Sequence, residues 1–206
     1  MRELKLKVCG MRDSANISLV AATQPDYMGF IFYPKSPRDV RANKAFNTDN
    51  IPERIEKVGV FVNARLQTIR QISRRYGLDV IQLHGDESAA FAKSVQDLKV
   101  KVIKAFRVAD KLPENLDDYE GSVDYFLFDT STPSYGGSGK QFDWSVLKSY
   151  DGSLPFFLSG GIGLDDIANV KTMEHPRLYG IDVNSKVEIQ PGLKNPERVK
   201  QIRAMI

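Results

Sequence analysis

The sequence is poor in cysteine and histidine and has no long apolar run. Its single cysteine, Cys9, excludes an internal disulfide and favours a reducing, cytoplasmic location. With only His84 and His175 beside it, no set of metal ligands can be assembled. No stretch approaches the roughly 20 apolar residues of a membrane span, and the N-terminus lacks the apolar core of a signal peptide.

Charge of one sign is also scarce, since the net charge is +3 and no long Lys or Arg run is present. This balance argues against nucleic acid and is compatible with a small anionic ligand. There is neither a Walker loop nor a dinucleotide fingerprint, so no cofactor is expected. The 206 residues show no linker or low-complexity segment, and we expect a single domain over 1–206.

Short apolar runs rich in β-branched and aromatic residues recur along the whole chain. They predict eight strands, over 4–9, 27–33, 57–62, 79–83, 100–106, 124–129, 154–159 and 178–183. Most gaps between them hold helix-like patterns, although the second gap is irregular and the fifth helix looks short. Helix start signals are expected at Asp13, Asp86, Asp143, Asp165 and Asn195.

Strict alternation of strands and helices predicts an α/β fold, a single (β/α)8 TIM barrel. An open doubly wound sheet is the alternative, although it usually uses fewer strands. In a barrel the functional residues lie where strands end. The run Tyr125–Phe128 ends in Asp129, followed by a glycine loop at 136–139 that could cover it. For an isolated aspartate the favoured interpretation is a cap on the loop at Thr130 or Ser131, and the rest of the chain decides between the two.

Cys9 ends the first predicted strand, with Lys7 on the same face. A lysine two residues below a thiol is expected to lower its pKa. The alternative is a small buried hydrophobic residue. His84, followed by Gly85 and Asp86, favours a structural or helix-capping role over a catalytic one.

The loops after strands seven and eight predict a phosphate site. Gly160 and Gly161 would let the backbone present N–H groups to an anion, with Asn184 opposite and Lys186 either adding charge or solvated. Arg38, stiffened by nearby prolines, would suit a carboxylate, unless it forms a surface salt bridge. A thiol, an acid and two anion sites together suit cofactor-free proton transfer on a phosphorylated, carboxylated small molecule.

With these motifs in place, the sequence resembles the phosphoribosylanthranilate isomerase family of tryptophan biosynthesis. The matching stretches cover nearly the whole chain, at 7–11, 29–32, 36–38, 60–63, 82–86, 136–139, 142–144, 158–162 and 182–192. The resemblance implies a monomeric or homodimeric barrel that catalyses an Amadori rearrangement of a phosphorylated substrate without a cofactor or metal.

By the same resemblance, Cys9 is the general base and Asp129 the general acid. Arg38 binds the anthranilate carboxylate, and Gln82 is a further substrate-binding residue. The phosphate would be surrounded, mainly through backbone N–H groups, by Gly160, Gly161, Asp182 and Asn184. The alternatives are another phosphate-binding barrel enzyme, such as an indole-glycerol-phosphate synthase, and a non-catalytic phosphometabolite sensor.

Overall fold

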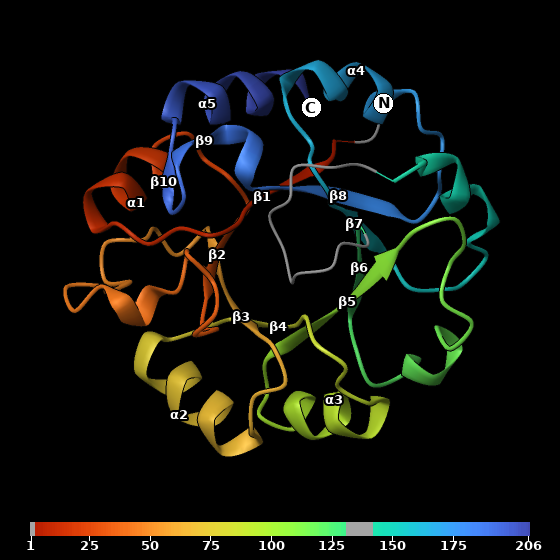
Figure 1. The fold of residues 1–206 in the computed structure, drawn as a ribbon, viewed down its shortest axis with the longest axis horizontal. Coiled ribbons are helices and arrows are strands. Elements are labelled where there is room, and N and C mark those ends of the chain that lie inside the picture. Colours follow the sequence, from red (N-terminus) through yellow and green to blue (C-terminus); the bar gives the residue numbers. More distant parts are fainter. Residues whose placement is uncertain (1–2, 131–141) are drawn as a thin grey trace.

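The centre of the molecule is a closed parallel barrel of eight strands, seen in a computed structural model that describes residues 3–130 and 142–206 (Figure 1). Each strand pairs with the next along the chain, and β1 closes the ring against β8. The barrel is confirmed, and the open sheet is excluded. The strands are β1 (Lys5–Val8), β2 (Tyr27–Ile31), β3 (Glu56–Phe61), β4 (Val80–Leu83), β5 (Lys101–Val108), β6 (Tyr125–Thr130), β7 (Phe156–Leu158) and β8 (Leu178–Val183).

Alternation along each strand divides the core into an outer and an inner layer. Leu6 and Val8 of β1 belong to the large apolar layer between the strands and the helices. Lys7, between them in sequence, is buried and pairs with Asp182 of β8, as the alternation predicts. The barrel interior is filled below this level by one cluster, namely Tyr27, Val58, Val80, Ile103, Ala105, Leu127 and Phe157.

In the described part of the chain, five α-helices lie around the outside of the barrel (Figure 1). Apolar residues at helical spacing face the strands: Ile69 in the third gap is fully buried, as are Val199 and Ile202 after the last barrel strand. The helices are α1 (Ser14–Ala21), α2 (Leu66–Tyr76), α3 (Ala89–Gln96), α4 (Ile167–Lys171) and α5 (Pro196–Met205).

Within the described residues, three of the gaps contain only short 3-10 helices in place of an α-helix. They are η1 (Val40–Ala42) after β2, η2 (Asp117–Tyr119) after β5 and η3 (Trp144–Ser149) after β6, while η4 (Leu164–Asp166) leads into α4. These economical connections suit a chain of 206 residues. The expected glycine lid at 136–139 lies outside the described residues.

The predicted helix starts are confirmed at three positions and wrong at two. The side chains of Asp13, Asp143 and Asn195 accept hydrogen bonds from backbone N–H groups of the first turn. Asp86 does not cap α3, because the helix begins later and Ser88 takes that position. The residue before η4 is Gly163, so Asp165 is not the cap there either.

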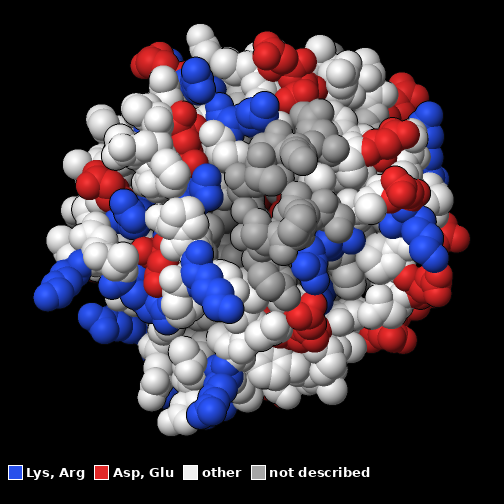
Figure 2. Space-filling model, in the orientation of Figure 1, with Lys and Arg blue, Asp and Glu red and all other residues white. Residues whose placement is uncertain are grey.

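A hairpin that the sequence did not predict follows β8. After η5 (Ser185–Val187), β9 (Glu188–Gln190) pairs antiparallel with β10 (Leu193–Lys194), between α1 and the edge of β1 in Figure 1. No helix in the described part of the chain is long and apolar enough to cross a membrane. Acidic and basic side chains are interspersed around the face shown in Figure 2, in keeping with the small net charge.

Candidate active site

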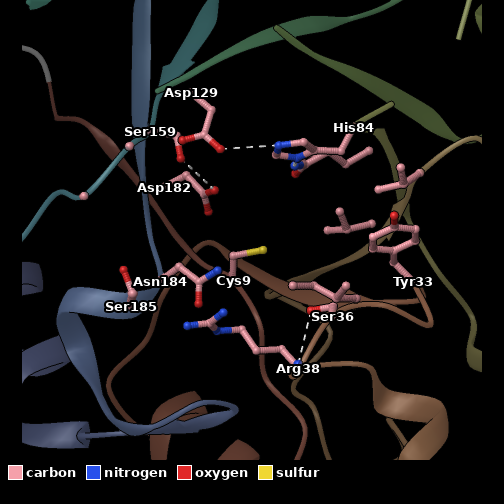
Figure 3. A pocket seen from close by; sticks show the side chains of 16 residues that line it. Cys9, Tyr33, Ser36, Arg38, His84, Asp129, Ser159, Asp182, Asn184 and Ser185 are labelled. Carbon is pink, nitrogen blue, oxygen red and sulfur yellow. Dashed lines mark hydrogen bonds and ion pairs between the residues drawn. The ribbon is translucent and has the colours of Figure 1, made fainter. Parts of the chain in front are cut away.

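A pocket lies at the carboxyl ends of the barrel strands, where a parallel barrel concentrates its functional side chains (Figure 3). It is lined by residues of β2, β3, β4, β6 and β8 and of the segments that follow β1, β2, β3, β4, β7 and β8. The structure therefore brings together the eight residues predicted to be catalytic or substrate-binding, which are Cys9, Arg38, Gln82, Asp129, Gly160, Gly161, Asp182 and Asn184.

Cys9 follows the last residue of β1 and is 4% exposed. Gly29 of β2 lies directly beside it, since a Cβ on that glycine would come within 2.8 Å of Cys9 Sγ. Burial raises the pKa of the Cys9 thiol above its usual value, and Lys7 opposes this only in part. The expected net lowering was therefore wrong: Lys7 acts in the expected direction, but desolvation of the thiolate is the larger effect.

Lys7 is fully buried beneath the thiol. Its Nζ lies 2.8 Å from Asp182 Oδ1, and Ser159 Oγ donates to the other carboxylate oxygen at 3.3 Å. Burial opposes the charge on Lys7, but Asp182 and Cys9 outweigh it and raise the pKa of the amine. The side chain of Asp182 is thus paired with Lys7 and Ser159 inside the barrel. Its expected contact with a phosphate would be made by its backbone, and this contact stays a prediction.

Asp129 lies near the end of β6 with its side chain in the pocket. Its Oδ1 accepts a hydrogen bond from the Thr130 N–H at 2.9 Å, which is the contact expected of an aspartate that caps the loop. Its Oδ2 faces His84 Nε2 at 3.3 Å (Figure 3). The carboxylate therefore makes a local backbone contact and also faces the pocket.

His84 lines the pocket beside Asp129, a position that the sequence did not predict. Its Nδ1 lies 2.7 Å from Gln82 Nε2. Because an amide nitrogen donates, Nδ1 accepts, and the proton of the neutral ring then lies on Nε2, facing Asp129. The other end of Gln82, Oε1, is buried and accepts no hydrogen bond from any described residue.

Arg38 projects from the loop after β2. Its guanidinium donates to the Glu188 carboxylate from Nε at 2.9 Å and from Nη2 at 2.6 Å. The Arg38 and Glu188 side chains are 9% and 5% exposed, so this is a buried bidentate pair and not the surface salt bridge considered as an alternative. The guanidinium still lines the pocket and points toward Asn184 (Figure 3).

The two expected anion loops meet on the β7–β8 side of the pocket. Gly160 and Gly161 have φ of +95° and +69°, which a residue with a Cβ adopts only with strain. A Cβ on Gly160 would also come within 2.9 Å of the Thr130 backbone nitrogen. Asn184 and Ser185, from the loop after β8, also line the pocket, whereas the Lys186 side chain is exposed and outside the pocket lining. Lys186 is therefore solvated.

Over residues 3–130 and 142–206, no cluster of three or more His, Cys, Asp or Glu side chains is arranged to hold a metal ion. The chemistry available in the pocket is that of a thiol, two carboxyl groups, an imidazole and a guanidinium, together with glycine-rich backbone. This set can move protons and hold anions.

Comparisons with known proteins point to one family. A family profile described as N-(5'phosphoribosyl)anthranilate (PRA) isomerase matches residues 6–204. The N-(5'-phosphoribosyl)anthranilate isomerase of Parabacteroides distasonis is 46% identical over 198 residues, which are 95% of this chain and 90% of the relative. The phosphoribosyl anthranilate isomerase of Thermus thermophilus superposes with a TM-score of 0.83 at 27% identity, covering 98% of each chain. Another, crystallised with reduced 1-(o-carboxyphenylamino)-1-deoxyribulose 5-phosphate, has a TM-score of 0.75 at 27% identity, covering 97% of this chain and 96% of that one.

Proposed function

Because the chain belongs to the N-(5'-phosphoribosyl)anthranilate isomerase family, we propose that the pocket at the barrel mouth carries out this isomerisation with Asp129 as acid and Cys9 as base. The reaction converts N-(5-phosphoribosyl)anthranilate into 1-(2-carboxyphenylamino)-1-deoxyribulose 5-phosphate in tryptophan biosynthesis. The observation that supports the assignment most strongly is that one pocket holds both groups, beside Arg38 and the turn of Gly160 and Gly161.

The first step opens the ribose ring. Asp129 gives its proton to the ring oxygen, the bond from that oxygen to C1′ breaks, and the anilino nitrogen supplies the electron pair of a C1′=N iminium ion. His84 Nε2, 3.3 Å from the carboxylate, keeps Asp129 turned into the pocket. A carboxyl group held in this way acts as a general acid without any cofactor.

The second step moves a proton from C2′. The positive iminium makes the C2′ hydrogen acidic, and the Cys9 thiolate removes it to give an enolamine. The Cys9 thiol then returns its proton to C1′, and the enol O–H gives its proton to the Asp129 carboxylate as the C2′=O bond forms. Both groups regain their starting protonation states, so that protons and electrons balance over the cycle. Cys9 and Asp129 come from strands that β7 and β8 separate in the barrel, which leaves room for the sugar between them.

Binding at the two ends of the substrate supplies the positioning. Arg38 binds the anthranilate carboxylate, while Gly160, Gly161 and Asn184 surround the phosphate, with Asp182 contributing its backbone. Gln82, which lines the pocket from β4, is the further substrate-binding residue. Holding both ends places C2′ near the thiol, and such orientation accounts for a large share of rate enhancement in enzymes.

The assembly and location belong to the same proposal. The single cysteine favours a reducing, cytoplasmic setting, and the family resemblance favours a monomer or homodimer, without nucleic acid or membrane partners. The 206 residues act as one domain.

The catalytic assignment is tested by removing each group singly. Cys9→Ala and Asp129→Asn should each lower kcat by roughly 10²–10⁴-fold, because each loses one proton-transfer group. Turnover is followed through the fluorescence of the anthranilate moiety, and binding of the reduced product analogue should persist in both variants. Asp143→Asn, a helix-cap change outside the pocket lining, serves as the control and should keep its kcat. Near-normal turnover in either catalytic variant would remove that residue from its role.

A further inference from the structure

The hairpin after β8 sends two charged side chains into the protein interior beside the pocket. Glu188 begins β9 and Lys194 ends β10, and Lys194 is fully buried. Lys194 Nζ lies 2.6 Å from Glu188 Oε1, and the Gly192 N–H donates to the same oxygen at 2.9 Å. The acid–base steps proposed for the reaction use neither side chain. A buried charged pair of this kind is costly to maintain, so its contacts indicate what it does.

The contact that matters most is the one with Arg38. Glu188 occupies the edge of the guanidinium formed by Nε and Nη2. A planar guanidinium carries five N–H donors, and the edge formed by Nη1 and the second hydrogen of Nη2 is left over. Within the described residues Nη1 donates no hydrogen bond to protein. The side chain thus has one edge fixed from behind and one edge available for an incoming carboxylate.

Lys194 connects this pair to the other end of the site. Its Nζ contacts Asn184 Oδ1 at 2.6 Å and the Asn184 carbonyl oxygen at 3.3 Å, in addition to Glu188. Asn184 belongs to the loop proposed to surround the phosphate. The buried ammonium group of Lys194 therefore contacts both Glu188, which supports Arg38, and Asn184, which belongs to the loop proposed to surround the phosphate.

We propose that Glu188, held in place by Lys194, is a positioning residue that fixes the orientation of Arg38 so that its outer edge faces the carboxylate of the substrate. The inference rests on the proposed role of Arg38 in substrate binding. An unsupported arginine samples many rotamers and must be ordered when the ligand binds. The bidentate contact with Glu188 orders it beforehand, and affinity for the carboxylate rises accordingly.

A change in net charge could also alter anion binding when Glu188 is replaced, and this effect can be separated from the orientation of Arg38. A carboxylate beside Arg38 cancels its charge, so removing Glu188 could by itself strengthen the binding of an anion. Burial lowers the pKa of Lys194 to about 8 even with Glu188 beside it, and without that carboxylate the amine is expected to lose its proton. Arg38, Glu188 and Lys194 together carry +1, and the same group with Glu188→Gln also carries +1. Because the net charge is then the same, a change in the preference for a carboxylated ligand reports the orientation of the Arg38 guanidinium.

The test compares two ligands that differ only in the carboxylate. One is reduced 1-(o-carboxyphenylamino)-1-deoxyribulose 5-phosphate, and the other is its counterpart made from aniline. Their dissociation constants are measured by titration calorimetry at pH 7 with the whole protein. Glu188→Gln should reduce the preference for the carboxylated ligand roughly tenfold, the size expected when an aligned charged hydrogen bond is lost. Its affinity for the aniline ligand should stay within twofold, and KM should rise while kcat holds.

Two further variants sharpen the comparison. Glu188→Asp keeps the charge but is one methylene shorter, so it should lose preference in the same direction and provides the test if Glu188→Gln does not fold. Glu87→Gln is the matched control, because Glu87 forms another buried pair, with Lys104, that does not involve Arg38. It should leave the preference unchanged.

Arg38→Met separates this inference from the proposed function. If Arg38→Met abolishes the preference and Glu188→Gln leaves it unchanged or increases it, the positioning role of Glu188 is overturned and the role of Arg38 stands. If Arg38→Met itself keeps the preference, Arg38 does not bind the carboxylate and the proposal for Glu188 fails with it. Loss of affinity for both ligands in Glu188→Gln would show a general disturbance and also overturn the specific role.

Discussion

At the scale of single residues, the decisive environment is that of Cys9. The thiol is nearly enclosed, and the low polarity of that setting disfavours the thiolate that a base requires. Lys7 counteracts this from directly beneath, and its own charge is held by Asp182. The resting protein therefore holds mainly a thiol near neutral pH, and the population of thiolate depends on the lysine.

Thiol alkylation as a function of pH checks this balance. The folded pKa of Cys9 is raised by burial, so alkylation by iodoacetamide should increase at higher pH than for an ordinary cysteine. Lys7→Met removes a group that lowers this pKa, and the midpoint should move further up. Lys5→Met changes the same strand at a more exposed ion pair with Asp26 and should leave the midpoint in place. A midpoint that falls in Lys7→Met would contradict the assignment.

The sequence could reveal Cys9 and Asp129 because each ends an apolar run that reads as a strand. It could not reveal the roles of His84 and Glu188, because their partners Asp129 and Arg38 are far away in the chain. The role of Lys194 was missed because its contacts with Glu188 and Asn184 depend on a hairpin that the sequence did not predict. Glu188 and Arg38 are separated by 150 positions, and no local pattern encodes such a pairing. The direction of the Cys9 pKa was missed for a related reason, since the extent of burial is a property of the closed barrel.

At the scale of elements, the strands were predictable and several of the connections were not. β8 coincides with the predicted 178–183, because β-branched and apolar residues between polar ends describe a buried parallel strand. The gap after β2 lacks a sustained apolar face, and it contains only η1 among its described helices. The hairpin of β9 and β10 is too short, at three and two residues, to leave a periodic signal.

The cap of α5 provides a test at this scale. Asn195 Oδ1 accepts from the N–H groups of Glu197 and Arg198 at 3.0 and 3.3 Å. Asn195→Ala should lower the free energy of unfolding by about 1 kcal/mol, measured by urea denaturation, since the first turn loses its acceptor. Asn195→Asp keeps an acceptor and should be much less affected. Equal stability of Asn195→Ala and the unmodified protein would show that the cap contributes nothing.

At the scale of the whole molecule, the residues proposed to react and the residues that stabilise the core lie at different levels of the barrel. The polar pocket lies at the carboxyl ends of the strands, and a cluster of aliphatic and aromatic side chains fills the barrel interior below it. Phe157 is fully buried there, with ring centroids 5.3 Å from Tyr27, 5.2 Å from Tyr179 and 5.6 Å from Tyr125. Edge-to-face contacts of this kind stabilise a core without touching the ligand.

Phe157→Leu tests that separation. Loss of ring contacts should reduce the free energy of unfolding by about 1–2 kcal/mol, because a smaller side chain packs less completely against three aromatic neighbours. The kcat/KM of the folded protein should stay near normal, as measured in the same fluorescence assay. Leu19→Ala, at an exposed position on α1, is the comparison and should change neither quantity appreciably. A tenfold loss of kcat/KM in folded Phe157→Leu would show that the two regions are coupled.

The pairing of β1 with β8 has a consequence for how the protein is made. Lys7 and Asp182 face each other across this seam although 175 positions separate them in the chain. At roughly 5–20 residues per second, a ribosome needs on the order of 10–35 seconds to synthesise that length. Throughout this time the lysine beneath the thiol lacks its counter-charge, and the first strand lacks one of its two neighbours. The emerging chain therefore cannot acquire activity gradually: the reactive centre is completed by the last barrel strand to leave the ribosome.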